Sequence, residues 1–83
     1  MGMKFNETLK NIRRNQGLTQ RDVYLRLGVS PNCYASWEQG RTQPDIESLK
    51  KLCVIFDVAA DWLLGLDDPA EVARIKNSLK SDN

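Results

Sequence analysis

The sequence predicts a small all-α protein of six short helices, and three observations predict it. Apolar residues recur three and four positions apart in several segments, which is the spacing of one helix face. Residues that favour helix starts precede these segments, and glycines follow several of them. The 83 residues are enough for one domain with one modest core.

The first expected helix begins at Phe5, which shares an apolar face with Leu9 and Ile12 and is followed by Gly17. Residues 1–4 before it are expected to be frayed. Two further helices are expected in the stretch TQRDVYLRLGVSPNCYASWEQG at 19–40.

A tight turn joins these two helices. Thr19 and Ser30 are suited to cap their starts, and Pro31 stands at a first helical position, where its missing N–H costs nothing. Gly28 easily adopts the left-handed conformation that ends a helix, and Gly40 ends the second helix. Two helices joined by so short a turn must cross steeply, which is the helix-turn-helix arrangement.

The second of these helices has an apolar side made by Tyr34 and Trp37, which we expect to face the core. Short or flat side chains near its start then face outward. A helix that enters the DNA major groove needs such residues at its N-terminal end, some of them able to bond base edges. An ordinary helical hairpin with a solvated face is the alternative that the spacing leaves open. The outward-facing residues are Pro31, Asn32, Cys33 and Ser36.

A fourth helix, capped by Asp45, and a short fifth helix at about 60–64 that ends at Gly65 complete the expected bundle. In the fifth helix Trp62 is expected in the core, with an exposed apolar patch as the alternative. The fourth helix is expected to bury its apolar residues, which follow at helical spacing: Ile46, Leu49, Leu52, Cys53 and Phe56.

The segment DDPAE at 67–71 is a strong helix start, with an acidic cap, proline at the first position and glutamate at the third. Val72, Ile75 and Leu79 follow on one face of this sixth helix. Because the helix is too short to be stable alone, the stripe must bury against something. It either folds back on the domain or meets its copy in a second chain, and we favour dimerisation.

Charge is unevenly distributed along the chain, although the net charge is only +1. Residues 1–43 carry seven Lys/Arg against three Asp/Glu, and residues 44–83 carry five against eight. Such a chain is expected to point its basic half at phosphate. Ordinary charged helix surfaces are the alternative.

Several chemistries are excluded by composition. Histidine is absent, which excludes imidazole catalysis and His-ligated metal sites. The two cysteines, Cys33 and Cys53, fit neither a metal knuckle nor a disulfide framework, so we expect reduced thiols in the cytoplasm. The sequence has no membrane span or secretory h-region and no catalytic constellation. We expect no enzyme activity, no cofactor and no bound metal.

Five motifs follow one another in a specific order and spacing: GLTQ at 17–20, LGVS at 27–30, WEQG at 37–40, Pro44 and DWLLG at 61–65. Together they resemble the Cro and lambda-repressor-like (XRE-type) helix-turn-helix family, over about residues 5–65. The resemblance implies a five-helix bundle with the third helix in the major groove. Here a sixth helix follows.

The resemblance also implies residue roles. Arg13 and Glu38 match a structural ion pair that holds the first helix against the third. Gln20 is similar to the family's backbone and base-edge contact. The expected base-reading set is Gln20, Pro31, Asn32, Cys33 and Ser36, and the expected DNA-backbone set is Lys10 (or else a solvated charge), Arg21, Arg41, Thr42 and Gln43.

Four residues depart from the family pattern. Tyr24 stands where a small residue is usual, so either the helix crossing is wider or the ring finds an exit. Leu25 is apolar at a usually polar position. Asp57 and Ala59 replace a glycine and an N-capping residue, which weakens a turn before the fifth helix.

We therefore expect a sequence-specific transcriptional repressor that reads an inverted-repeat operator as a dimer, with the helix at about 31–39 in the major groove. Residues 1–66 form the DNA-binding domain, 67–80 a C-terminal helix and possible dimerisation element, and 81–83 a disordered tail. One alternative is an antitoxin that binds its own operator and a toxin. Another is a helix-turn-helix used only for protein contact, and an antirepressor is a further possible partner.

Overall fold

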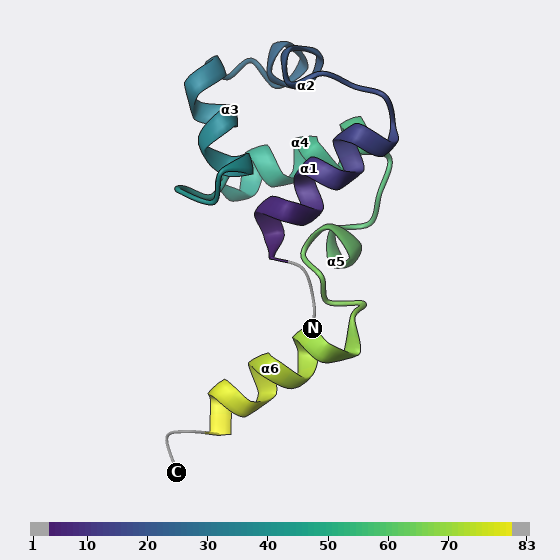
Figure 1. Ribbon diagram of the computed structural model, residues 1–83, viewed down its shortest axis with the longest axis vertical. Helices are drawn as coiled ribbons and strands as arrows, with labels where there is room; N and C mark the ends of the chain where they lie inside the picture. Colours follow the sequence, from purple (N-terminus) through teal and green to yellow (C-terminus); the bar gives the residue numbers. More distant parts are fainter. Residues whose placement is uncertain (1–3, 81–83) are drawn as a thin grey trace.

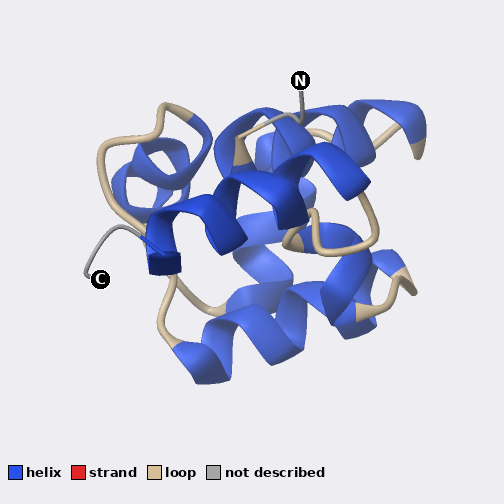
Figure 2. Cartoon of the chain, turned by 90° about the horizontal axis from the view of Figure 1, so that it is seen from below, coloured by secondary structure: helices blue, strands red, loops and turns tan. Residues whose placement is uncertain are grey.

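A computed structural model describes residues 4–80, and these residues form six helices and no strand. Helices α1 to α5 make one bundle, and α6 extends away from it, so that the molecule measures 45 × 21 × 19 Å (Figure 1). Figure 2 shows the same helices and loops from the end that carries α6. The predicted all-α class is confirmed. The helices are α1 Phe5–Asn15, α2 Gln20–Leu27, α3 Pro31–Glu38, α4 Ile46–Phe56, α5 Ala60–Leu63 and α6 Pro69–Lys80.

Side-chain caps begin most of these helices. Thr19 and Asp22 form a reciprocal capping box on α2: Thr19 Oγ1 accepts from the Asp22 N–H at 3.0 Å, and Asp22 Oδ2 accepts from the Thr19 N–H at 2.8 Å. Ser30, Asp45 and Asp68 likewise accept backbone N–H groups at the starts of α3, α4 and α6. The predicted helix starts are therefore made by local chemistry.

Two predictions concern the chain termini. Lys4 is the N-cap of α1, and its backbone N–H donates to Glu7 Oε1 at 3.3 Å, so the expectation that Lys4 is frayed is wrong. The reason is that Glu7 lies at the third helical position, from which its carboxylate reaches back to the cap. The predictions for residues 1–3 and for the tail at 81–83 fall outside the described residues.

Helices α2 and α4 each end at a residue in the left-handed backbone conformation. Gly28 has φ +76° and nothing lies within 4 Å of a Cβ placed there, so only its backbone conformation calls for glycine. Asp57 adopts φ 55° at the end of α4, where a side chain makes this conformation costly. Ala59 offers no side-chain cap to α5. That these two departures weaken the turn between α4 and α5 stays a prediction.

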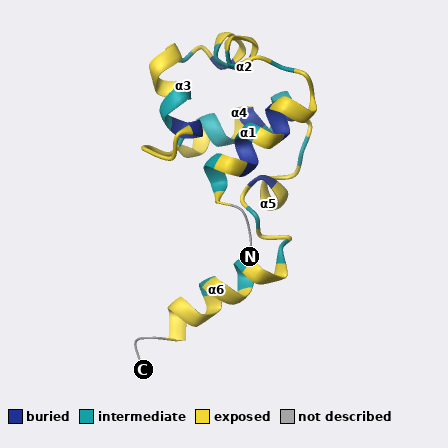
Figure 3. Ribbon diagram, in the orientation of Figure 1, coloured by how far each residue is buried: buried dark blue, intermediate teal, exposed yellow. Residues whose placement is uncertain are grey.

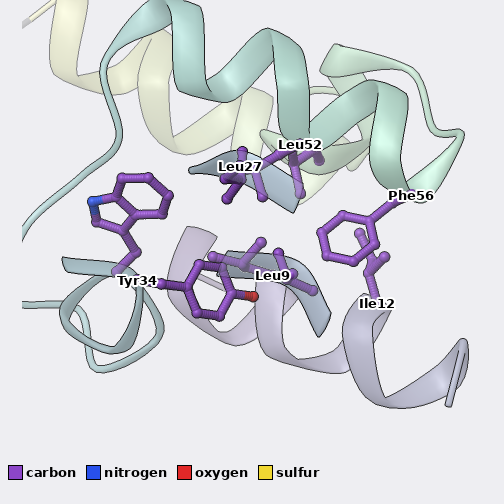
Figure 4. Close-up of a cluster of buried hydrophobic side chains, with 9 residues drawn as sticks. Leu9, Ile12, Leu27, Tyr34, Leu52 and Phe56 are labelled. Atoms are coloured by element: carbon purple, nitrogen blue, oxygen red, sulfur yellow. The ribbon is translucent and has the colours of Figure 1, made fainter. Parts of the chain in front are cut away.

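The core lies between α1, α2, α3 and α4, with one residue from α5 (Figure 4). The rings of Tyr34 and Trp37 pack edge to face, with centroids 5.8 Å apart. Tyr24 is half-buried and packs against the edge of the core, so of the two expected outcomes its ring points out of the helix crossing. The buried apolar residues are Leu9, Ile12, Val23, Leu27, Tyr34, Trp37, Leu52, Phe56 and Leu63.

Two predicted core residues are exposed. Ile46 is 74% exposed because the buried face of α4 is centred on Leu52 and Phe56, and Ile46 lies at its margin in the first turn. Trp62 is 46% exposed, whereas its neighbour Leu63 is fully buried. Helix α5 has a single turn, which ends one residue earlier than predicted, and only one of its large side chains can point straight into the core.

The sixth helix has no buried residue (Figure 3). Val72 and Ile75 are half-buried, and Leu79 is 73% exposed. Within one chain Leu79 is therefore uncovered near the far end of α6, which points away from the bundle (Figure 1), whereas Val72 and Ile75 are partly covered. Over residues 4–80, every helix falls short of the length and apolar character needed to cross a bilayer.

Candidate nucleic-acid interface

The start of α3 lies at the surface of the helix pair. Pro31, Asn32 and Cys33 are exposed there, while Tyr34 and Trp37 on the opposite side of the helix are buried. The Ser30 cap and Pro31 fix the direction in which this end leaves the turn. The structure thus places three of the five predicted base-reading residues together on one exposed surface.

A buried carboxylate ties α1, α2 and α3 together behind this surface. Glu38 accepts from Arg13 Nε at 2.6 Å and from Arg13 Nη2 at 3.0 Å, so the two residues form the expected ion pair. Tyr34 Oη donates to Glu38 Oε2 at 2.5 Å, and Gln20 Nε2 donates to Oε1 at 3.0 Å. Arg13 Nη1 also donates to the Leu18 carbonyl at 2.9 Å. The crossing of the three helices is therefore fixed by one hydrogen-bonded network.

The electrostatics of this network keep each group in its bonding form. Burial alone would raise the pKa of Glu38, but hydrogen bonds from Arg13, Tyr34 and Gln20 outweigh it and lower that pKa below its ordinary value. The hydrogen bond to Glu38 raises the pKa of Arg13. Burial and the neighbouring carboxylate raise the pKa of Tyr34. Tyr34 thus remains a donor and Glu38 an acceptor at neutral pH.

The stability of the fold is expected to fall in acid because of Glu38. Its pKa is lower in the folded chain than the ordinary 4.5, so its contribution is complete above that pH and disappears as the pH falls through the folded value. The exposed Asp22 and Asp45 and the half-buried Glu71 also have lowered pKa values, mainly through hydrogen bonds from Thr19, Ser48 and Arg74 respectively.

The measurement is urea denaturation between about pH 6 and pH 3. The control is a triple variant, Asp22→Asn, Asp45→Asn and Glu71→Gln, which removes these three carboxylates and keeps at each position an amide oxygen that can accept a hydrogen bond. We expect the triple variant to retain most of the acid-induced destabilisation. A stability that no longer changes with pH in that variant would contradict the assignment to Glu38.

The orientation of the Gln20 amide follows from the same network. A carboxylate can only accept, so the amide nitrogen must face Glu38 and the carbonyl oxygen must point away from it. Gln20 is half-buried at the first position of α2. Its side chain is therefore held in place by the buried network.

Ser36 has a structural role that the sequence analysis missed. Its hydroxyl donates to the Cys33 carbonyl at 3.0 Å and hydrogen-bonds with Thr42 Oγ1, while its own carbonyl accepts from the Arg41 N–H at 3.0 Å. The predicted backbone-contact loop is thereby fastened to α3. The signal in the sequence, a hydroxyl residue six positions before another, is too common to have predicted this.

Asn6 is a second residue that the sequence analysis did not identify. Its side chain donates to the Glu38 carbonyl at 3.4 Å, and a Cβ at Gly40 would come within 3.2 Å of it. The start of α1 is therefore packed against the end of α3. Glycine at 40 is required both by φ +78° and by this close approach.

The predicted backbone contacts lie on three elements. Arg41, Thr42 and Gln43 are exposed in the loop after α3, and Arg21 is exposed beside Gln20 at the start of α2. Lys10 is half-buried on α1. The structure brings the loop residues next to α3, whereas Lys10 belongs to a different helix from the reading surface.

Two steeply crossed helices, an exposed start of the second helix and a polar loop fastened to its end define a helix-turn-helix domain. A helix-turn-helix family model matches residues 9–63. The chain therefore belongs to this helix-turn-helix family, which includes transcriptional regulators.

Named relatives agree with this assignment. The chain is 36% identical over 75 residues to the HTH-type transcriptional activator BcrR of Enterococcus faecalis, covering 90% of this chain and 37% of BcrR. It is 32% identical over 66 residues to the HTH-type transcriptional regulator ImmR of Bacillus subtilis, covering 80% of this chain and 52% of ImmR. It is 30% identical over 76 residues to the cryptic phage CTXphi transcriptional repressor RstR of Vibrio cholerae, covering 92% and 68%.

A solved structure is also similar. The crystal structure of a transcriptional regulator from Listeria innocua superposes with a TM-score of 0.71 at 25% identity, covering 98% of this chain and 94% of that one. The first two of the three relatives above are considerably longer than this chain, which spans 37% of one and 52% of the other. The similarity to them therefore concerns the helix-turn-helix part.

Proposed function

We propose that this chain binds DNA in a sequence-specific manner as a homodimer in the cytoplasm and represses transcription by occupying its operator. The observation that carries the proposal is the exposed start of α3, held in a fixed direction by the buried network around Glu38. A rigid platform of this kind keeps short polar side chains within reach of base edges. Relatives include both a named activator and a named repressor, so repression is part of the proposal.

Each exposed residue has a distinct chemical role in this proposal. Asn32 can form two hydrogen bonds with adenine, since its side-chain amide nitrogen donates and its amide oxygen accepts. The outward oxygen of Gln20 can accept from an exocyclic amino group of adenine or cytosine. Pro31 and Cys33 supply apolar contact. Arg21 and the loop at 41–43 bond phosphate and position the domain without specifying sequence.

Dimerisation is proposed through the stripe Val72, Ile75 and Leu79 on α6. Its support is that α6 has no buried residue in the single chain and leaves Leu79 73% exposed, although a helix of this length needs packing to persist. Two copies would then place their α3 helices in successive major grooves, about 34 Å apart. A single domain has few phosphate contacts, so pairing also supplies affinity.

The experiment is selection from a random DNA pool with purified protein at low and moderate salt. We expect an enriched inverted repeat whose half-sites are one helical turn apart. Enrichment of a single half-site would contradict the dimer and leave the sequence reading intact. A pool without any enriched sequence would contradict the proposed function and leave non-specific DNA binding or a purely protein-directed role.

A further inference from the structure

A cleft of about 650 Å³ separates the start of α6 from the bundle. Its walls come from the start of α1, the loop after α3 and the first turns of α6. In Figure 1, α6 runs toward the side of the bundle on which this loop lies. The polar and charged residues lining it are Lys4, Asn6, Thr42, Gln43, Glu71 and Arg74.

The cleft carries a net positive charge, with Lys4 and Arg74 against Glu71. Arg74 donates to both carboxylate oxygens of Glu71, from Nε at 2.8 Å and from Nη2 at 2.9 Å. The pair fixes the guanidinium plane, yet the Arg74 side chain remains 67% exposed. Because a guanidinium has five N–H donors, this arrangement leaves donors for a second anion.

The charge of α6 differs from that of the segment before it. The acidic balance of residues 44–83 lies outside α6, since residues 69–80 carry three Lys/Arg against one Asp/Glu. Helix α6 is therefore a basic segment within the acidic C-terminal half. Its cleft-facing residue Arg74 lies opposite the loop that we propose to contact the DNA backbone.

The cleft is also continuous with the reading surface. Thr42 lines it and is hydrogen-bonded to Ser36 of α3, and Gln43 follows directly. Neutral donors on one wall and cations on the others are the groups that bind phosphate oxygens. A DNA strand that passes over residues 41–43 would bring its next phosphates to this opening.

We propose that Lys4 and Arg74 bind a backbone phosphate of DNA that flanks the bases contacted by α3. This inference rests on the proposed function, and it extends the DNA footprint to a site that the helix-turn-helix motif does not include. Glu71 is then a positioning residue, because it orients the guanidinium and does not itself touch the DNA.

The test measures affinity for the selected DNA as a function of salt. We expect the double variant Lys4→Gln and Arg74→Gln to lower the salt slope by about 0.9 for each phosphate that is no longer neutralised. The matched control is Lys76→Gln with Lys80→Gln, which removes the same charge from another face of α6. These two residues are four positions apart, and Lys76 lines a separate recess beside Val72. The control is expected to leave the slope unchanged.

Neutral methylphosphonates placed one at a time beside the selected site provide a second readout. One flanking position should weaken wild-type binding and have no effect on the Lys4/Arg74 variant. Glu71→Gln should bind at least as tightly as wild type, because the glutamine oxygen can still accept from the guanidinium while a negative charge is removed from the cleft. Equal slope changes in the two double variants, or no sensitive flanking phosphate, would overturn the inference. Failure of the wild type to select any DNA would instead overturn the proposed function.

Discussion

Replacing Glu38 by alanine is expected to destabilise the fold by about 3–5 kcal/mol, because it leaves the buried Arg13 guanidinium unpaired. The side chains of Arg13 and Glu38 are only 10% and 2% exposed. Tyr34 and Gln20 would be deprived of their acceptor at the same time. Since a domain of this kind has about 5–15 kcal/mol of stability in total, we expect Tm to fall by about 15 °C or more.

Thermal and urea denaturation measure this effect, and Glu71→Ala provides the control. Glu71 also pairs with an arginine, but Arg74 is exposed, so removing that carboxylate should leave the urea midpoint essentially unchanged. A double variant, Arg13→Met with Glu38→Leu, should be more stable than Glu38→Ala because no charge remains buried without a partner. A Glu38→Ala midpoint close to wild type would contradict the assigned network.

Asn32→Ala is expected to weaken binding to the selected operator by about 1–3 kcal/mol, or roughly 5- to 160-fold, and to relax preference at one base pair. The salt slope should stay the same, since the variant keeps every group that we propose to bind phosphate. Stability should change little because Asn32 is exposed in the first turn of α3. Fluorescence anisotropy on the operator and on single-base variants measures both quantities.

Two variants separate this effect from general ones. Asn15→Ala removes an equally exposed amide at the end of α1 and should leave affinity unchanged. Arg41→Gln should weaken binding to all sequences alike and lower the salt slope by about 0.9. If Asn32→Ala instead lowered affinity equally for operator and random DNA, Asn32 would not contact a base.

The positions of the helices were predictable because their boundaries depend on neighbours in sequence. Thr19 accepts from the backbone N–H three residues further along the chain. The ring of Pro31 sets the φ that the first residue of α3 requires, and the positive φ of Gly28 ends α2. The ion pair of Arg13 and Glu38 spans 25 residues, and it was predicted only through the resemblance to a known family. No local pattern indicates that these two residues meet.

The candidate site was predictable in part for the same reason. The exposure of Pro31, Asn32 and Cys33 follows once Tyr34 and Trp37 are assigned to the core. Their role toward DNA stays a prediction. Ser36 was predicted to face the groove, and the structure also engages it with Thr42 from the following loop.

The sequence by itself determined the all-α class, the helix caps, the helix-turn-helix and the outward face of α3, because each depends on residues within one or two turns. Only the tertiary structure decided that Trp62 is exposed and Leu63 buried, since the direction in which α5 packs sets which of two adjacent apolar residues points inward. It also decided the orientation of the Gln20 amide and the cleft beside Arg74. These features join residues from separate helices, and their geometry exists only after those helices have packed.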